Sequence, residues 1–573
     1  MKSYHAIIIA LCAAVFFVLF FFWPLLRVLS SAVMLDGHFT FGILGETLKN
    51  PVYVEGLLNS LALALVTTII VQAIGLPLAT AATRYSFPGK QAWNALVLVP
   101  LILPPFVGAI GIRQVLGQYG MLNAVLVKLG ICDWAGAYDW LGNGRFFAVA
   151  LTEALHLYPI FYLNAVAALA NVDPSMEEAA ACLGLSGIER FRRITVPLIM
   201  PGLFAGSTLV FIWSFTELGT PLVFDYNRLT AVQIFDGVKD IGMNPFPYAL
   251  TAIMLVVVVI FYGISKSLFG RFRGALLQKG AQTRTMERLS GWPLVFTLVL
   301  FSAVFFLAVL PHVGVILTSV SMGWYKTILP CKFTYAHYLN ALSHNLVVPS
   351  IRNSLFYSSA AASIAVALGF LIALVVERTR LRWRFILDAC AMLPLAVPGI
   401  VTAFGYIGMS QPGTLFAALN PANNPTALLI IAYAVRRLPY VVRATAAGLQ
   451  QTPVAFEEAA AAVGAAPMRV TWKITFPLVA AHLLAGGLLA FSFSMLEVSD
   501  SLMLAQKQCH YPITKALFEL FQLLGEGRYL AAAFGVWAMC FLFLALLCIN
   551  RLRSGKTSDR VGAGGRPGGI FEI

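Results

Sequence analysis

Long apolar segments are the feature that most constrains how this chain of 573 residues can fold. A helix that crosses the hydrocarbon core of a bilayer needs about 20 consecutive apolar residues. Twelve such segments lie near residues 6–32, 57–82, 93–114, 146–170, 200–222, 248–269, 292–320, 354–376, 387–409, 426–447, 479–503 and 531–550. None shows the strict alternation that is typical of membrane β-barrel strands. Because only 11% of the residues are charged, against about a quarter in soluble proteins, we expect an all-α polytopic membrane protein surrounded by a lipid bilayer.

The two halves of the chain repeat one another. Pairs with an offset of 294 come first and pairs with an offset of 280 follow: Asn59 and Asn353, Arg84 and Arg378, Pro100 and Pro394, Pro104 and Pro398, then Pro159 and Pro439, Gly184 and Gly464, Pro197 and Pro477, Glu217 and Glu497. One insertion of about 14 residues in the first half explains the change, and the loop near 115–145 is where it would be tolerated. The prolines at 100 and 394 predict distorted spans that line a path.

The repeat predicts two tandem six-helix units. An even number of helices gives both units the same orientation, related by an axis along the membrane normal. The expected organisation is a first transmembrane domain at 1–270, a basic cytoplasmic linker at 271–290, a second transmembrane domain at 291–552 and a flexible cytoplasmic tail at 553–573.

Positive charge predicts the orientation. Lys and Arg are densest in the 266–288 linker and at 377–384, which places both termini in the cytoplasm by the positive-inside rule. The net charge of +14 is then explained by topology and anionic-lipid contact, and no nucleic-acid partner is expected. The first apolar run is too long for a signal peptide and is interpreted as an uncleaved membrane helix. The eight cysteines form no CxxC or Cys/His cluster, so no metal site is expected.

One short polar segment occurs twice in this apolar chain. Residues 177–184 read EEAAACLG and residues 457–464 read EEAAAAVG, each in a predicted cytoplasmic loop between the fourth and fifth helices of its half. Asp173-Pro174 and Thr452-Pro453 predict helix starts, and the glycine that ends each segment predicts a helix stop. The acidic residues are expected to point outward. Two matched helix–turn–helix loops on one face indicate two identical receivers.

The sequences EAAACLGLSGIERFRRITVP and EAAAAVGAAPMRVTWKITFP resemble the EAA loop, EAA-x3-G-x9-I-x-L-P, of type I ABC importer permeases. Val196 and Phe476 replace the leucine of that pattern. The wider chain is most similar to fused, double-length permeases of ferric-iron importers. The resemblance implies that the loops at 171–200 and 451–480 dock on an ATPase. It assigns this coupling role to Glu177, Glu178, Ala179, Ala180, Gly184, Glu457, Glu458, Ala459, Ala460 and Gly464.

The same resemblance implies the partners and the place of the protein. They are an ABC ATPase homodimer, which binds ATP and Mg²⁺, and an extracytoplasmic solute-binding protein that delivers the substrate. The expected place is the bacterial inner membrane. The chain itself is expected to bind no cofactor and to catalyse no reaction, because the GKT within residues 554–558 lacks the preceding glycine, strand and helix of a phosphate-binding loop.

Ionisable residues within spans are candidates for the transport path. Glu217 and Glu497 are repeat-equivalent and lie about 30 Å beyond the prolines of their EAA loops along a continuous helix. They are expected in the outer half, where they either face one another and attract a cation or meet the binding protein, or else reach the outer interface or nearby backbone amides. His156 and Arg436, also repeat-equivalent, either line an inner gate or reach cytoplasmic headgroups.

The substrate suggested by the resemblance is ferric iron. Thiamine, a polyamine, a phosphonate or an inorganic anion are alternatives within the same importer class. A secondary transporter without an ATPase is a second class, which explains the spans and the repeat but not the two EAA loops.

Overall fold

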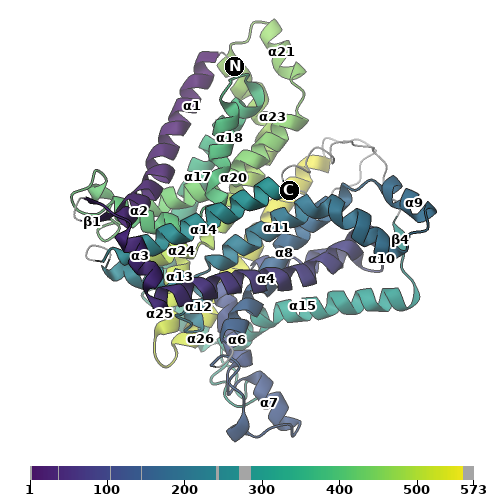
Figure 1. Ribbon diagram of the computed structural model, residues 1–573, viewed down its shortest axis with the longest axis vertical. Coiled ribbons are helices and arrows are strands. Elements are labelled where there is room, and N and C mark those ends of the chain that lie inside the picture. Colours follow the sequence, from purple (N-terminus) through teal and green to yellow (C-terminus); the bar gives the residue numbers. More distant parts are fainter. Residues whose placement is uncertain are drawn as a thin grey trace.

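The computed structural model describes residues 3–35, 38–102, 105–142, 145–240, 244–269 and 286–558, and almost all of their regular structure is helical (Figure 1). The helices of the first half are α1 Ser3–Phe17, α2 Trp23–Val33, α3 Gly42–Lys49, α4 Pro51–Arg84, α5 Lys90–Leu96, α6 Pro105–Leu116, α7 Met121–Lys128, α8 Arg145–Ala170, α9 Pro174–Cys182, α10 Gly187–Arg190, α11 Val196–Phe215, α12 Gly219–Val223, α13 Thr230–Asp236 and α14 Phe246–Phe269.

The helices of the second half are α15 Gly291–Ser319, α16 Ala336–Ser343, α17 Val347–Arg378, α18 Arg384–Met392, α19 Gly399–Met409, α20 Thr426–Gln451, α21 Ala455–Ala462, α22 Pro467–Val470, α23 Phe476–Met495, α24 Ser499–Leu504, α25 Ile513–Gln522 and α26 Gly527–Ser558. The strands are two-residue pairs: β1 Met34–Leu35 runs antiparallel to β2 His38–Phe39, and β3 Tyr85–Ser86 runs parallel to β4 Glu287–Arg288.

The helices have the length and composition of membrane spans. Within the described ranges nine are long and apolar enough to cross a bilayer, and two bent pairs bring the number to eleven if each pair is one span. The remaining predicted segment is α20, a helix of 26 residues that carries Arg436, Arg437 and Arg443. The protein is therefore an all-α polytopic membrane protein, as predicted.

The repeat is visible helix by helix. At the offset of 294, α3 and α6 correspond to α16 and α19, and at the offset of 280, α10 and α11 correspond to α22 and α23. Between the two offsets the first half contains the α-helix α7, whereas the second half has only a 3-10 turn, Ala417–Leu419, before α20. The insertion predicted near 115–145 thus lies between α6 and α8, and the fold is two tandem six-helix units.

The prolines bend the third span of each half. Helices α18 and α19, which flank Pro394 and Pro398, are bent by 99°, and the helices on either side of residues 103 and 104 are bent by 94°. Proline removes a backbone donor and clashes with the preceding turn, so the distortion predicted for these spans is confirmed.

The first helix of each half packs against the other half. Helix α2 contacts α19, and α15 contacts α6. Glycines permit this approach: a Cβ on Gly111 of α6 would lie 2.2 Å from the Pro311 carbonyl oxygen of α15, and one on Gly405 of α19 would lie 2.7 Å from that of Pro24 in α2. Gly111 and Gly405 are repeat-equivalent, so the halves exchange their first helices in the same manner.

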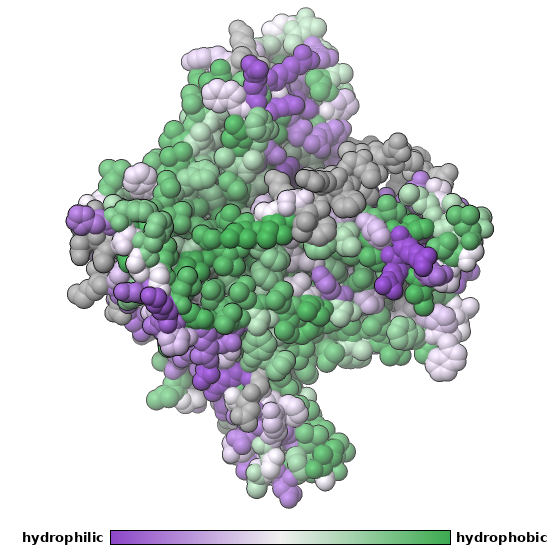
Figure 2. Space-filling view, viewed as in Figure 1, coloured by the Kyte–Doolittle hydropathy of each residue, from purple (hydrophilic) through white to green (hydrophobic). Residues whose placement is uncertain are grey.

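Apolar residues cover the flanks of the molecule, and polar residues gather at its ends. Figure 2 shows an apolar surface across α4 and α14, while hydrophilic residues gather around α9, α10 and α21. The exposed side chains on α14 include Val256, Val259 and Ile260. Such a surface fits a lipid environment.

Two predicted domain boundaries can be compared with the structure only in part. Helix α26 continues to Ser558, beyond the predicted end of the second domain at 552, and residues 559–573 of the predicted tail lie outside the described residues. Most of the predicted linker, residues 271–285, also lies outside them.

Candidate coupling loops and polar centre

The first candidate coupling loop is built around α9. The Asp173 side chain accepts a hydrogen bond of 2.9 Å from the Ser175 amide, which caps the helix start as predicted. Gly184 has a φ of +84°. The Leu185 amide returns to the Ala180 carbonyl at 3.1 Å, which is the geometry of a glycine-terminated helix.

The second loop ends in the same way but begins differently. Gly464 has a φ of +83°, and the Ala465 amide returns to the Ala460 carbonyl at 3.1 Å. The predicted cap at Thr452 is wrong. Its hydroxyl donates to the Gly448 carbonyl of α20 at 2.9 Å, and α21 begins only at Ala455. Thr452 therefore belongs to the end of the preceding helix.

Glu177 points into the protein, which corrects the expectation that both acids of the motif face outward. It is 6% exposed, forms an ion pair with Arg84 and accepts a hydrogen bond from the Thr195 hydroxyl. Arg84 also donates to the Thr195 hydroxyl at 2.7 Å. Arg84 ends α4, and Thr195 directly precedes α11. The first glutamate thus joins the coupling helix to the second and fifth spans.

The second half repeats this anchor. Arg378 at the end of α17 contacts Glu457 with an Nε–Oε1 distance of 2.8 Å. It also donates to the carbonyls of Leu449 and Thr452 at 2.8 and 2.9 Å. Arg84 and Arg378 were visible in the sequence as a repeat pair, but nothing local to either arginine connected it with a glutamate far along the chain.

The outward faces of the two loops match. Glu178, Ala179, Glu458 and Ala459 are exposed, whereas Ala180 is buried and Ala460 is partly buried. Each loop also has two exposed apolar positions that the sequence interpretation missed. At the first position Leu183 and Val463 are 82% and 86% exposed, and at the second position Ile188 and Met468 are exposed on the helices that follow. The members of each pair are 280 residues apart.

A turn of π-helix follows each short second helix, at Phe191–Thr195 and Thr471–Thr475. Both end on a buried threonine, Thr195 or Thr475. Such turns are uncommon and are often found at functional sites. Here each one joins its coupling loop to the fifth span of its half without a break in the helix.

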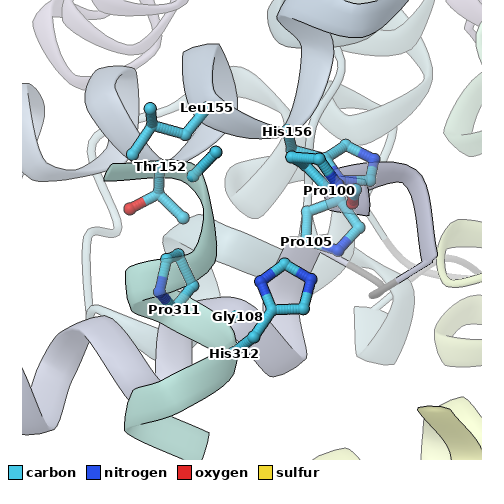
Figure 3. Close-up of a pocket in the computed structure, with 9 residues that line it drawn as sticks. Pro100, Pro105, Gly108, Thr152, Leu155, His156, Pro311 and His312 are labelled. Atoms are coloured by element: carbon cyan, nitrogen blue, oxygen red, sulfur yellow. The ribbon is translucent and has the colours of Figure 1, made fainter. Parts of the chain in front are cut away.

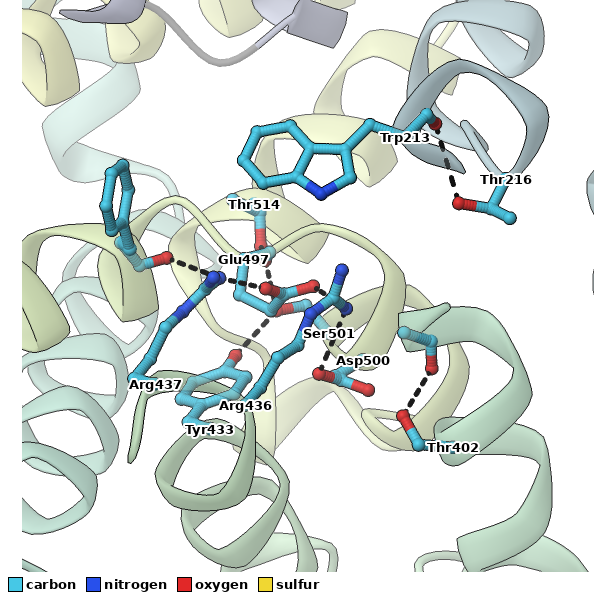
Figure 4. A network of polar contacts seen from close by, with 12 residues as sticks. Trp213, Thr216, Thr402, Tyr433, Arg436, Arg437, Glu497, Asp500, Ser501 and Thr514 are labelled. Carbon is cyan, nitrogen blue, oxygen red and sulfur yellow. Dashed lines mark hydrogen bonds and ion pairs between the residues drawn. The ribbon is translucent and has the colours of Figure 1, made fainter. Parts of the chain in front are cut away.

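A charged network occupies the centre of the second half (Figure 4). The Glu497 carboxylate, which is buried, forms ion pairs with Arg437 and, at 2.9 Å, with Arg436. Arg436 Nη1 also lies 3.6 Å from Asp500 Oδ2. The Thr514 hydroxyl donates to the Glu497 carbonyl at 2.7 Å. Glu497 therefore reaches no outer interface, and Arg436 and Arg437 lie inside the bundle.

The first half has a carboxylate, Glu217, at the place equivalent to Glu497, but it lacks these arginines. Glu217 accepts hydrogen bonds from the Thr220 amide and hydroxyl at 3.2 and 3.4 Å, which agrees with the alternative of nearby backbone amides. Glu153 is 2% exposed and accepts a hydrogen bond from Ser214. His156 and Leu157 stand where Arg436 and Arg437 stand in the second half. Glu217 and Glu497 are therefore equivalent in the repeat but have different partners, Thr220 in the first half and two arginines in the second.

A polar cavity of about 670 Å³ lies at the end of the molecule near α7, which Figure 1 shows opposite to α21. Its lining includes Arg113, Arg145, Arg528, Asp139 and Asp225. Arg113 and Asp225 form an ion pair of 3.0 Å, and Arg145 donates to the Asp225 carbonyl at 2.7 Å.

The inserted segment of the first half forms part of this cavity and contacts the second half. The Lys326 amide donates to the Tyr119 carbonyl at 3.0 Å. Its ammonium group lies 5.1 Å from the Tyr119 ring centroid and 5.4 Å from those of Trp134 and Tyr325. These are cation–π distances. The insertion therefore adds to the cavity wall and fastens it to the neighbouring repeat.

Several known proteins are similar to this chain. One is a ferric transport system permease protein FbpB of Actinobacillus pleuropneumoniae, which is 26% identical over 77% of this chain and 63% of its own length. Another is a putative ferric transport system permease protein of Haemophilus influenzae, which is 26% identical over 86% of this chain and 77% of its own length. A probable molybdenum ABC transporter permease protein of Haloferax volcanii is 31% identical over 37% of this chain and 76% of its own length.

The family model of the binding-protein-dependent transport system inner membrane component matches residues 73–274 and 365–551. Each match begins within the second span of one half and continues through the coupling loop into the sixth span. Together the two matches cover more than half of the chain. The chain therefore belongs to this family of ABC transporter permeases and carries its transmembrane domain twice.

Proposed function

We propose that this protein is the permease subunit of an ABC importer and that a separate ATPase homodimer docks on its two coupling loops. The observation that carries the proposal is the match between the exposed faces of α9 and α21. Each presents a glutamate, an alanine and a bulky apolar residue at equivalent positions. Exposed apolar side chains that are rimmed by polar residues mark protein–protein contact surfaces. Two equal surfaces on one chain suit two copies of one partner.

The buried anchors would transmit movement from the ATPase to the spans. Arg84 and Glu177 join α9 to α4, and Arg378 and Glu457 join α21 to α17. When ATP closes the ATPase dimer, the two loops would be drawn together and the helices fixed to them would follow. ATP and Mg²⁺ would be bound by the partner, whose differential affinity for the two states drives the change.

Substrate would enter from the side opposite to the coupling loops. The 670 Å³ cavity would lie on the extracytoplasmic face, where a solute-binding protein would dock. This arrangement requires both termini to be cytoplasmic and the chain to reside in a bacterial inner membrane. The charge distribution of the loops supports it.

We propose ferric iron as the substrate. Two of the similar proteins are named for ferric transport. The polar centre adds a physical reason, because Glu153 and Glu217 of the first half lack the arginine partners that neutralise Glu497. We assign Glu217 to the path, and we expect Glu497 to hold the helices of the second half together. Thiamine, a polyamine, a phosphonate or an inorganic anion remain alternatives, and the relative named for molybdenum fits the last of these.

Uptake of radiolabelled ferric iron under iron starvation tests the proposal. Cells that lack the gene should lose uptake. Cells that carry Glu178→Lys together with Glu458→Lys should lose it by about tenfold or more, because two reversed charges would each weaken docking on the ATPase by about 1 kcal/mol or more. The matched control, Glu46→Lys, reverses an exposed charge of α3 that lies in neither coupling loop and does not line the cavity near α7, and it should keep uptake.

Two results would contradict different parts of the proposal. Unchanged iron uptake in the deletion strain, with no second importer present, would exclude ferric iron and leave the importer class standing. Normal uptake by the double charge reversal would exclude the coupling role of the loops. Purification of the permease without any ATPase subunit, under conditions that preserve the membrane complex, would favour the secondary-transporter alternative.

A further inference from the structure

Two cavities of the protein differ in the size of the molecule that they can admit. The one between α8 and α15, with His156 and His312 among its lining residues, has a volume of about 20 Å³ (Figure 3), which is room for about one water molecule. The cavity near α7 has a volume of about 670 Å³, within the range of small-molecule sites, about 300–1,000 Å³. Of the two, the cavity near α7 can admit a solute.

The walls of the cavity near α7 have an excess of positive charge. Its charged lining residues within the described ranges are Arg113, Arg145, Arg528, Asp139 and Asp225. The arginines thus outnumber the aspartates by one. A cleft whose walls have an excess of one sign of charge concentrates solutes of the opposite sign. The cavity therefore favours a negatively charged solute.

Both aspartates of the cavity have partners within the protein. The Asp225 carboxylate lies 3.0 Å from the Arg113 guanidinium. The Asp139 carboxylate accepts hydrogen bonds from the amides of Leu141 and Gly142 at 3.2 and 2.6 Å. A carboxylate that already faces a cation or amide donors attracts a positively charged solute less strongly, because part of its charge is balanced locally. The two aspartates therefore do not make this cavity a cation site.

Two of the arginines have neutral partners. Arg145 donates to the Asp225 carbonyl at 2.7 Å. Arg528 donates to the Tyr529 hydroxyl at 2.8 Å, and its guanidinium carbon lies 4.8 Å from the centroid of the Tyr529 ring. Within the described part of the chain, neither Arg145 nor Arg528 forms an ion pair with a carboxylate. Because a guanidinium has five N–H donors, both arginines keep donors for a ligand.

The backbone beside these arginines has an unusual conformation. Across the described ranges, Asp225 and Lys326 are the non-glycine residues with positive φ, at +55° and +56°. Asp225 lines the cavity, and Lys326 directly follows the lining residue Tyr325. Sparsely populated backbone conformations of this kind gather at ligand sites. In this conformation Asp225 meets Arg113 with its carboxylate and Arg145 with its carbonyl, so one residue brings two arginines of the wall together.

We infer that the cavity near α7 binds a small anion with several oxygen acceptors, such as a polycarboxylate, and that Arg145 and Arg528 hold it. Arginine binds carboxylate and phosphate groups through two parallel N–H donors. The role of this site in transport rests on the proposed function, because only there is the cavity assigned to the extracytoplasmic face. A ferric ion would then arrive with an anionic ligand, since the arginines repel a free cation.

Calorimetric titration of the purified full-length chain with citrate tests the inference. The wild type should bind one citrate per chain. Arg145→Gln and Arg528→Gln should each weaken binding by about tenfold or more, because hydrogen bonds to charged groups are among the stronger ones. The matched control is Arg228→Gln, since Arg228 lies outside the cavity lining and forms an exposed ion pair of 3.0 Å with Glu55. It should bind citrate as the wild type does.

A parallel titration with spermidine, a cation, needs no variant to fold and should show no binding. Wild-type protein that binds no citrate would overturn the inference and leave the arginines to contact acidic side chains of a protein partner. Stronger binding of spermidine than of citrate, or equal citrate binding by all four proteins, would also overturn it. These results do not depend on iron uptake. If the deletion strain kept ferric uptake while Arg145 and Arg528 proved necessary for citrate binding, the ferric assignment would fail and the anion site would stand.

Discussion

At the residue scale, the two neighbouring glutamates of each coupling helix have opposite surroundings. Successive residues of an α-helix are turned by about 100°, so only one of them can face the bundle. Glu177 faces Arg84 and Thr195, and Glu178 is exposed. The first acid thus holds the helix in place, and the second is free for a partner.

This division predicts unequal effects on stability. Arg84→Ala would leave the buried Glu177 carboxylate without its main cation, a change that costs about 3–5 kcal/mol in folded proteins. We expect a clear fall in the thermal unfolding midpoint of the purified protein. The exposed control, Glu178→Gln, should change the free energy of unfolding by less than about 0.5 kcal/mol.

A double substitution separates charge from packing. Glu177→Gln in the Arg84→Ala background removes the buried negative charge that has lost Arg84, so part of the lost stability should return. An Arg84→Ala protein that unfolds at the wild-type temperature would show that the ion pair does not anchor α9.

At the element scale, the exchange of first helices depends on glycines. A Cβ on Gly111 would overlap α15, and a Cβ on Gly405 would overlap α2, in both cases against backbone atoms. Small residues allow helix backbones to approach closely within membranes. The two contacts therefore hold the halves together more tightly than apolar side chains alone would.

We expect Gly111→Ala and Gly405→Ala each to destabilise the protein by about 1–3 kcal/mol, as other overpacked contacts do. Thermal denaturation of the purified variants measures this. Gly263→Ala in α14 is the matched control, because nothing lies within 4 Å of its added Cβ and alanine favours the helix. If both variants were as stable as the wild type, α15 and α2 would be shown to make room for the added methyl groups without loss of stability.

At the scale of the whole molecule, the proposed docking on a cytoplasmic ATPase requires both coupling loops to lie on the cytoplasmic side of the membrane. Three exposed native cysteines report on it: Cys182 ends α9, whereas Cys331 and Cys509 lie in loops predicted on the opposite side. Each side of the protein therefore has at least one exposed thiol that a labelling reagent can reach.

Labelling with a membrane-impermeant maleimide measures this orientation. In cells with a permeabilised outer membrane, variants that keep only Cys331 or only Cys509 should react. A variant that keeps only Cys182 should react only after the inner membrane is opened. Reaction of Cys182 in cells with an intact inner membrane would reverse the proposed orientation and place both loops out of reach of a cytoplasmic ATPase.

The sequence alone was sufficient for the features that depend on local pattern. The length of the apolar segments predicted the helices, and the offsets of 294 and 280 predicted the tandem repeat and the position of its insertion. Gly184 and Gly464 predicted the ends of the coupling helices, because a left-handed residue there favours glycine. Each of these signals is contained within a few turns of the chain or repeats at a constant spacing.

Only the tertiary structure decided which side chains meet. Arg84 reaches Glu177 across 93 positions, and Arg437 reaches Glu497 across 60; no local signal links either pair. The same holds for Thr452, whose hydroxyl is taken by the end of α20, and for the exchange of α2 and α15 between the halves. A span's sequence shows that it is apolar, but its neighbours and its rotation depend on packing against helices distant in the chain, since apolar surfaces carry little directional information.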